Sequence, residues 1–274
     1  MGRGTTRGRP IVEGWLWPAV RDKLAEGWSP EQISGWLRTQ FPFNPELWVS
    51  HETIYQAVYY LPRGAMRDQV TEQIALRTGR RARRPQSRQA RATRGNGKPW
   101  TTGFHVSDRT PEAADRAVPG HWEGDLIIGA RAASAVITLC ERQTRFVMLG
   151  ALAESRASED VIPVLIELMR TLPQHLASTL TWDQGAELAG HRGFTLATDC
   201  KVYFCDPHAP WQRGTNENTN GLIRQYLPKS TDLRHYTQAD LDEIAHKLNT
   251  RPRKTLDWAT PTEAMSKLLV ATTT

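Results

Sequence analysis

Residues 121–130, "HWEGDLIIGA", alternate in the way expected of a β-strand, and they set the predicted fold. Trp122 and Leu126 point to one side of the strand, and Glu123 and Asp125 share the other side. An aspartate inside an apolar strand is costly unless it is paired or binds a cation. Asp125 is therefore the first candidate for a functional carboxylate.

The next two apolar segments extend this strand into a sheet. "AVITLC" and "RFVMLGAL" are separated by the polar residues "ERQT", a pattern typical of a hairpin. Together with residues 121–130 they predict three consecutive strands that pair antiparallel.

The following segments predict a mixed α/β arrangement. Residues 158–172 have a helical apolar pattern, although Pro163 lies within it. "STLTWDQG" is a strand that ends at Asp183, and "KVYFC" is a later strand. The expected order is three strands, a helix, a strand, a helix, a strand and a helix, and sheets of this kind carry functional side chains at strand ends.

A third carboxylate of interest lies in residues 206–229, "DPHAPWQRGTNENTNGLIRQYLPK". A helix is expected over residues 216–226, with Glu217 on its polar face and Leu222 and Ile223 directed toward the sheet. A solvated glutamate on an amphipathic helix is the simplest interpretation of Glu217 taken alone. The functional interpretation depends on its relation to the two aspartates.

Three carboxylates in these settings suggest metal-dependent chemistry. Carboxylate oxygens are the ligands that Mg²⁺ prefers, and a group of them that binds two metal ions activates water or a hydroxyl for in-line displacement at phosphorus. Asp125, Asp183 and Glu217 are the candidates for such a group.

The distribution of charge indicates a nucleic-acid partner. The net charge of +6 divides into +9 over residues 1–100 and −3 over the remainder. Residues 77–98 contain nine Lys or Arg and no acid, which is typical of an extended linker. This linker is either a solvated tether or an arm that follows DNA phosphates, and the basic context favours the arm.

The N-terminal region has helical signals. Ser29, Pro30 and Gln32 form a capping box with proline at the first helical position. Residues 51–60 form a second predicted helix, and an earlier one is expected near residues 17–24. The three predict a helix-turn-helix whose helix 51–60 enters a DNA groove, or else a small bundle without a ligand.

The cysteines and the hydropathy of the chain indicate the cellular compartment of the protein. The three cysteines Cys140, Cys200 and Cys205 lie in apolar runs, which suits a reducing compartment, and we interpret them as core residues rather than zinc ligands with His208. No apolar run reaches the length of a membrane span, about 18 residues. We expect a soluble, intracellular protein.

Four stretches together resemble one family. "GHWEGDLIIG", "LTWDQGAELAGH", the stretch 206–229 and "LNTRPRKTLDWATPTEAM" are similar to the DDE transposases of insertion sequences of the IS-thirty type, over about residues 11–268. The resemblance implies an RNase H-like core related to that of retroviral integrases, and the family triad falls on Asp125, Asp183 and Glu217. Between the last two lie 33 residues, as the family spacing requires.

The resemblance also implies roles. Asp125 is expected to bridge two Mg²⁺ ions, for which Mn²⁺ substitutes, with Asp183 on one ion and Glu217 on the other. The expected partners are the terminal inverted repeats of the element and target DNA, bound by a homodimer or larger assembly. The residues expected to contact DNA are His51, Arg80, Arg81, Arg83, Arg84, Trp211, Arg213, Arg224 and Lys229.

The predicted organisation has three parts. Residues 1–75 form an all-α helix-turn-helix domain, residues 76–112 a basic flexible linker, and residues 113–274 an RNase H-like domain with a mixed five-stranded sheet flanked by helices. Family members carry a further helical region upstream, so a shortened copy is expected. A non-catalytic DNA-binding regulator derived from a shortened transposase is the alternative function, and a nuclease or integrase that uses the same triad is another.

Four further side chains are open to more than one interpretation. Glu123 is either an extra ligand or a hydrogen-bonding support for the site. His121, His191 and His208 are candidates for proton transfer or DNA contact.

Overall fold

The computed structural model describes residues 16–60, 101, 103–115, 117–152, 155–206 and 210–271. The chain divides into two compact units, one of Met1–Gln86 with Arg251–Thr260 and one of Ser87–Thr250 with Pro261–Thr274. Most of the predicted linker lies outside the described residues, so the domain limits 1–75, 76–112 and 113–274 stay a prediction. The grouping of Arg251–Thr260 with the N-terminal helices was not among the expectations.

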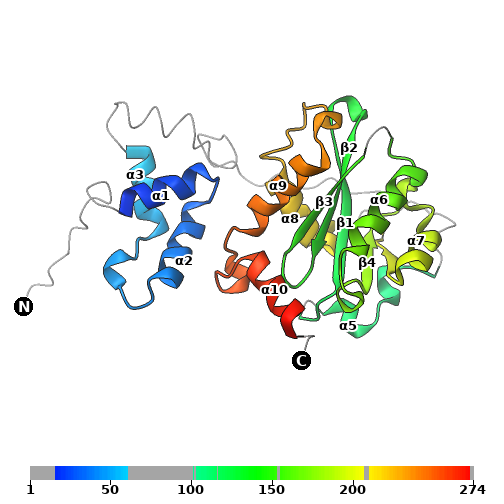
Figure 1. The fold of residues 1–274 in the computed structure, drawn as a ribbon, viewed down its shortest axis with the longest axis horizontal. Coiled ribbons are helices and arrows are strands. Elements are labelled where there is room, and N and C mark those ends of the chain that lie inside the picture. The colour runs from blue at the N-terminus through cyan, green and yellow to red at the C-terminus, as the bar shows by residue number, and fades with distance from the viewer. Residues whose placement is uncertain are drawn as a thin grey trace, which may run out of the picture. The chain divides into compact units, whose positions relative to one another are not determined.

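The larger unit is built on a five-stranded mixed sheet (Figure 1). Its strands are β1 (His121–Ile128), β2 (Ala135–Glu141), β3 (Val147–Ala151), β4 (Thr179–Trp182) and β5 (Lys201–Phe204). They are ordered β3-β2-β1-β4-β5, with β2 antiparallel to β1 and β3, and with β1, β4 and β5 parallel. This order and these directions confirm the RNase H-like fold class and the antiparallel pairing of the first three strands.

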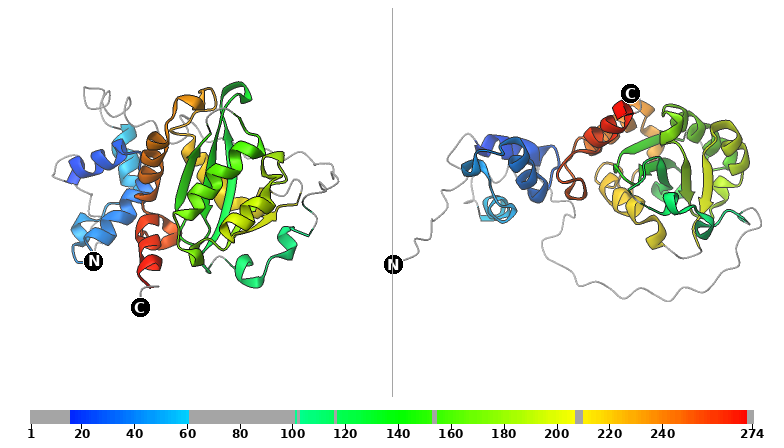
Figure 2. Two further views of the ribbon diagram at one scale, coloured as in Figure 1. Left: turned by 45° about the vertical axis from the view of Figure 1, so that its right-hand side comes forward. Right: turned by 90° about the horizontal axis from the view of Figure 1, so that it is seen from below.

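Helices cover both faces of the sheet (Figure 2). One face packs against α6 (Ser158–Arg170) and α7 (His191–Thr198), and the other against α8 (Gly214–Ile223) and α9 (Gln238–Asn249). Pro163 lies inside α6, so this proline does not mark the start of the helix. The short helix α5 (Pro111–Ala114) precedes the sheet, and α10 (Pro261–Ala271) adds Met265 to the α6 side.

The alternation predicted for β1 is confirmed. Trp122 is fully buried on the α6 side, where its indole Nε1 donates to the carbonyl of Leu176 at 2.7 Å. Gly124 lies on the same side, and a Cβ there would meet the ring of Trp182 at 2.3 Å, which explains the glycine. Glu123 and Asp125 therefore face α8.

The edge strand β3 is covered by side chains of α9. Asn249 accepts from the backbone N–H of Val147 and donates to its carbonyl, both at 2.9 Å. Gln238 accepts from the N–H of Ala151 at 2.9 Å and donates to the carbonyl of Leu149 at 2.8 Å. These bonds satisfy backbone groups that an open edge would present to other chains.

The smaller unit contains the three predicted helices, α1 (Leu16–Ala25), α2 (Pro30–Gln40) and α3 (His51–Tyr60). The capping box is confirmed, since Ser29 Oγ accepts from the N–H of Gln32 and the Gln32 side chain accepts from that of Ser29. An apolar cluster unites the helices and includes Trp17, Val20, Leu24, Ile33, Leu37 and Ile54.

Residues 251–260 complete the smaller unit. Arg251 is fully buried and donates to the carbonyl of Glu26 at 3.1 Å, and the Gln32 side chain donates to the carbonyl of Pro252 at 2.8 Å. A Cβ on Gly35 would lie 2.1 Å from the ring of Trp258, so α2 accepts that ring only because it has a glycine there. Across the described residues, no helix is long and apolar enough to span a membrane.

Candidate active site

The two predicted aspartates come together just beyond the point where the parallel pairing of β1 and β4 ends. Asp125 lies within β1, and Asp183 directly follows β4. The guanidinium of Arg213 contacts both carboxylates, with Nη1 at 3.3 Å from Asp125 Oδ1 and Nη2 at 3.5 Å from Asp183 Oδ2. Its Nη1 also donates to the carbonyl of Gly124 at 3.0 Å. One cation therefore links the two aspartates.

Further hydrogen bonds orient the Asp125 carboxylate. Its Oδ1 accepts from the N–H of Leu126 at 2.9 Å, and its Oδ2 accepts from Nδ2 of Asn220 at 3.1 Å. The hydroxyl of Thr138, opposite Asp125 in the β1–β2 register, donates to Oδ1 of Asn220 at 3.1 Å. Because Thr138 engages the amide oxygen, the Asn220 amide presents its NH₂ group to Asp125.

Asp183 is held in a simpler way. Its Oδ1 accepts from the N–H of Gly185 at 2.9 Å, and its side chain is 44% exposed against 27% for Asp125. Burial raises the pKa of Asp125; the positive charge of Arg213 opposes this increase, and the negative charge of Asp183 adds to it. The pair thus favours a cation beside it.

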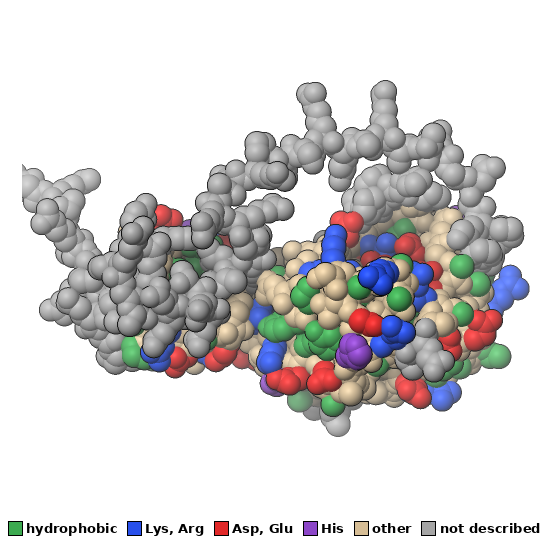
Figure 3. Space-filling view, turned by 90° about the horizontal axis from the view of Figure 1, so that it is seen from above, with side chains coloured by type: hydrophobic (Ala, Val, Ile, Leu, Met, Phe, Trp, Pro, Cys, Tyr) green, Lys and Arg blue, Asp and Glu red, His purple; other side chains and the backbone are tan. Residues whose placement is uncertain are grey.

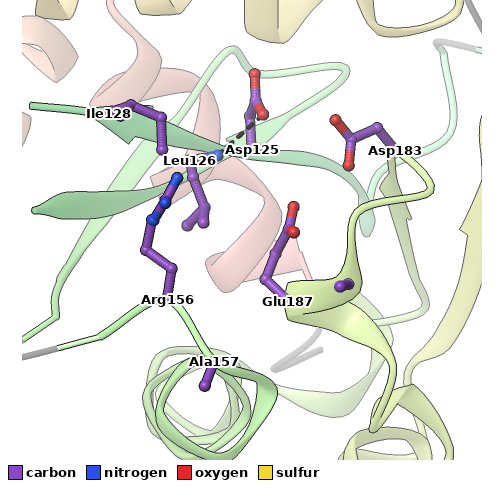
Figure 4. Close-up of a pocket in the computed structure, with 8 residues that line it drawn as sticks. Asp125, Leu126, Ile128, Arg156, Ala157, Asp183 and Glu187 are labelled. Atoms are coloured by element: carbon purple, nitrogen blue, oxygen red, sulfur yellow. Dashed lines mark hydrogen bonds between the residues drawn. The ribbon is translucent and has the colours of Figure 1, made fainter. Parts of the chain in front are cut away.

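Both aspartates open onto a cavity of about 550 Å³ (Figure 4). Arg156 and Glu187 also line it, with Arg156 on the side opposite Asp183. The Trp182 indole Nε1 donates to Glu187 Oε1 at 3.1 Å, which fixes that carboxylate. The full lining comprises Asp125, Leu126, Ile128, Arg156, Ala157, Asp183, Ala186 and Glu187.

Glu217 is positioned by its backbone and not by its side chain. It lies in the first turn of α8, its side chain is exposed, and among the described residues it makes no hydrogen bond or ion pair. It does not line the cavity. Within the same described ranges, no three His, Cys, Asp or Glu side chains are grouped closely enough to hold a metal ion. The structure therefore unites two of the three predicted carboxylates.

Glu123 explains how the start of α8 is held. Its carboxylate is fully buried, accepts from Nε of Arg142 at 3.2 Å, and accepts from the backbone N–H of Asn216 at 3.0 Å. Asn216 is the residue before Glu217, and Asn220 contacts Asp125 three residues after Glu217. Of the two interpretations of Glu123, the structure supports the hydrogen-bonding one.

The residues predicted to contact DNA have varied settings. Arg213 is paired with the aspartates, and Arg224 donates to the carbonyls of Ile128 at 2.8 Å and Leu227 at 3.2 Å. His51 is exposed and packs edge-on against Tyr55. Lys229 is exposed. Arg80, Arg81, Arg83 and Arg84 lie outside the described residues, and the side chain of Trp211 is not described either.

The two histidines near the site lie in the core. His121 is 5% exposed, its Nδ1 lies 2.8 Å from the hydroxyl of Thr179, and burial lowers its pKa. His191 is 1% exposed and packs edge-on between Phe104 and Phe204. Cys140, Cys200 and Cys205 are buried and free, as expected for core cysteines.

Four residues around the site were missed by the sequence analysis: Thr138, Arg142, Arg156 and Glu187. Thr138 is in register with Asp125, and the strand pattern contained that signal once β1 and β2 were paired. Arg142 reaches Glu123 from 19 residues away, and Arg156 reaches the cavity from the segment before α6. No local pattern could have indicated either position.

Comparison with known proteins identifies the relatives of the chain. No family model matches the chain. The chain is 49% identical over 266 residues to the transposase for insertion sequence element IS1086 of Cupriavidus metallidurans, covering 95% of this chain and 76% of that protein. It is 45% identical over 252 residues to the transposase InsI for insertion sequence element IS30A of Escherichia coli. This match covers 90% of this chain and 63% of that protein.

Two other likenesses are more distant. The transposase for IS4351 of Bacteroides fragilis is 35% identical over 259 residues, covering 93% of this chain and 75% of that protein. A chain of a simian T-cell lymphotropic virus intasome structure is 17% identical with a TM-score of 0.39, covering 60% of this chain and 54% of that one, a likeness too remote for a functional argument.

The three relatives compared above are all transposases of insertion sequences. The chain belongs to the IS-thirty family of such transposases, and it spans less than two thirds of the Escherichia coli relative. The resemblance read from the four sequence stretches is thereby confirmed.

Proposed function

We propose that this protein cleaves and joins DNA at the ends of an insertion sequence, and that Asp125, Asp183 and Glu217 hold the divalent metal ions required. The observation that carries the proposal is the pairing of Asp125 and Asp183 around one cation at a shared cavity. Adjacent strand ends in a mixed sheet are the usual place for such groups.

The aspartate pair fits a divalent cation. Arg213 already supplies one positive charge between the carboxylates, and the raised pKa of Asp125 reflects burial that a stronger cation would offset. Carboxylate oxygens are hard ligands suited to Mg²⁺ or Mn²⁺. Bound metal ions would supply Lewis-acid activation of the attacking group and stabilisation of the leaving oxygen.

Glu217 is the third proposed ligand. Its backbone lies between Asn216, bonded to Glu123, and Asn220, bonded to Asp125, so its Cα is held near β1. Its side chain is exposed and makes no bond that would have to be broken, among the residues described, for it to turn toward the aspartates. A change of side-chain rotamer costs little compared with a movement of the helix.

Other residues of the chain orient the substrate and the carboxylates. Asn220 and Thr138 keep Asp125 in one orientation, and Gly185 does the same for Asp183. Arg156 faces the cavity from the opposite side, where its positive charge suits a DNA phosphate. In this arrangement water attacks a phosphodiester phosphorus and displaces the 3′-oxygen of the element strand, which leaves as a 3′-hydroxyl. That hydroxyl then attacks a phosphodiester of the target and displaces the 3′-oxygen there.

The proposed partners are the inverted repeats of the element and a target duplex. Lys and Arg side chains alternate with Asp and Glu on the face of the larger unit in Figure 3, so the basic residues 1–100 remain the main electrostatic candidate for DNA binding. Two DNA ends are most simply held by two copies of the chain. We place the protein with the nucleoid in the bacterial cytoplasm.

A cleavage and strand-transfer assay tests this function. The purified full chain is incubated with labelled element ends, target plasmid and Mg²⁺, and cut and joined products are separated on a gel. We expect both products with Mg²⁺ or Mn²⁺ and neither with EDTA. End binding without either product, under all metal conditions, would favour the non-catalytic regulator instead.

A further inference from the structure

Arg213 has contacts that DNA binding alone does not explain. Its side chain is only 14% exposed, and its two terminal nitrogens reach Asp125, Asp183 and the carbonyl of Gly124. Among the described residues it is the only positively charged side chain in contact with either aspartate. A residue kept for phosphate contact would be expected to project into solvent.

Every carboxylate oxygen of the pair has a donor. Asp125 Oδ1 is shared by Leu126 and Arg213, and Asp125 Oδ2 is bound by Asn220. Asp183 Oδ1 is bound by the N–H of Gly185, which leaves Asp183 Oδ2 to Arg213. The guanidinium therefore uses one oxygen from each aspartate, and these are oxygens that the two carboxylates would also offer to a metal ion.

A metal ion and the guanidinium cannot both occupy this position. The two cations would need the same oxygens, and like charges a few ångströms apart repel. Without either cation, two neighbouring carboxylates would repel each other.

We propose that Arg213 is a positioning residue that holds Asp125 and Asp183 as a pair before metal binds, and that it must leave the pair for metal to enter. The inference rests on the proposed metal-dependent function.

The place of Arg213 in the chain links this exchange to Glu217. Arg213 ends the 3₁₀ turn Pro210–Arg213 and directly precedes α8, four residues before Glu217. While the guanidinium is bound to the strand ends, it ties this junction to β1 and β4. Its release removes that tie four residues before Glu217, the third proposed ligand.

Metal binding to the full chain without DNA tests the inference. Free Mn²⁺ is measured by electron paramagnetic resonance during titration of metal-free wild type, Arg213→Gln, Arg213→Lys and Asp125→Asn. We expect Arg213→Gln to bind Mn²⁺ about tenfold more tightly than wild type, because two partly exposed ion pairs no longer compete. Arg213→Lys should fall between them, since lysine is a point charge without the planar fork.

Arg156→Gln is the matched control. It removes an arginine that lines the same cavity as the two aspartates but contacts neither of them. Its affinity for Mn²⁺ should therefore stay within about twofold of wild type if contact, and not the general field, is responsible. An equal gain in Arg156→Gln and Arg213→Gln would overturn the inference.

The remaining outcomes separate this inference from the proposed function. If wild type binds Mn²⁺, Asp125→Asn does not, and Arg213→Gln binds no more tightly than wild type, then only the role of Arg213 is wrong. If no variant binds Mn²⁺, both proposals fail. Should Arg213→Gln not fold, as judged by circular dichroism, Arg213→Lys decides, and an affinity at or below the wild-type value overturns the inference.

Discussion

The two sides of the site differ in how firmly their carboxylates are held. The sheet side carries Asp125 and Asp183, and the helix side carries Glu217. On the sheet side, Asp125 and Asp183 each accept backbone N–H bonds and share Arg213. On the helix side, the backbone around Glu217 is docked through Asn216, but the Glu217 carboxylate is exposed. The fold thus fixes two of the three proposed ligands in advance, and the third would have to turn toward them.

The same contrast separates two neighbours on β1. Glu123 and Asp125 share one face of the strand, yet Glu123 is fully buried against Arg142, whereas Asp125 lies at the cavity beside Arg213. One carboxylate therefore supports folding and the other is available for chemistry. Their partners distinguish them, because the strand pattern is identical for both.

The largest expected effect comes from the sheet side. Asp125→Asn and Asp183→Asn each remove a proposed metal ligand, and metal charge stabilisation is worth several kcal/mol, so strand-transfer rates should fall by about a thousandfold or more. The rates are measured with pre-cleaved element ends and Mg²⁺. Retention of more than about a tenth of wild-type activity by either variant would mean that its aspartate is not a ligand.

Glu123→Gln changes the buried carboxylate of the two neighbours on β1, and its main expected effect is on the free energy of unfolding. It removes the negative charge beside the buried guanidinium of Arg142, and loss of one member of a buried ion pair costs about 3 kcal/mol or more. Urea unfolding should show this loss, whereas Asp125→Asn should change the free energy of unfolding by about 1 kcal/mol or less because its ion pair is partly exposed. Equal losses in the two variants would erase the distinction between them.

Asn220 lies on α8 and donates to Asp125 on β1, so it connects the two sides of the site. Its removal should lower the strand-transfer rate moderately. Asn220→Ala removes the NH₂ group that orients Asp125, and loss of such a supporting bond typically costs about 10- to 100-fold in activity. Asn218→Ala is the control, since Asn218 is an exposed asparagine on the same helix. Strand-transfer rates that fall equally in both variants would point to a general effect on α8 instead.

Thr138→Val should have the smallest effect. The substitution keeps the shape of the side chain and removes the hydroxyl that fixes the Asn220 amide, so we expect a loss of about 1 kcal/mol in unfolding free energy. Activity should fall less than in Asn220→Ala, because Asn220 itself remains. A greater loss of activity in Thr138→Val than in Asn220→Ala would contradict this order of support.

Local patterns predicted most of the fold. The alternation in residues 121–130, the capping box at Ser29 and the strand before Asp183 all depend on neighbours along the chain. Each is confirmed, although that strand ends at Trp182, one residue earlier than expected. The place of residues 251–260 in the smaller unit was not predictable in this way. It depends on Trp258 packing over Gly35, a contact between segments far apart in the sequence.

The site was predicted less completely, for the same reason. Arg213 was expected to contact DNA phosphates because it is a cation in a polar stretch, but its actual partners come from β1 and from the end of β4. The helical period placed Glu217 on a polar face, and its exposure agrees with that. Periodicity fixes the side of a helix but cannot tell whether a carboxylate reaches a site.

The central claim is that Glu217 serves catalysis and not folding, and one paired measurement tests it. Glu217→Gln and Glu159→Gln both neutralise an exposed glutamate in the first turn of a helix, on α8 and α6. Strand transfer should fall about a thousandfold in Glu217→Gln and stay near wild type in Glu159→Gln, while both melting temperatures should change by less than about 2 °C. Wild-type strand transfer by a folded Glu217→Gln protein would contradict the account.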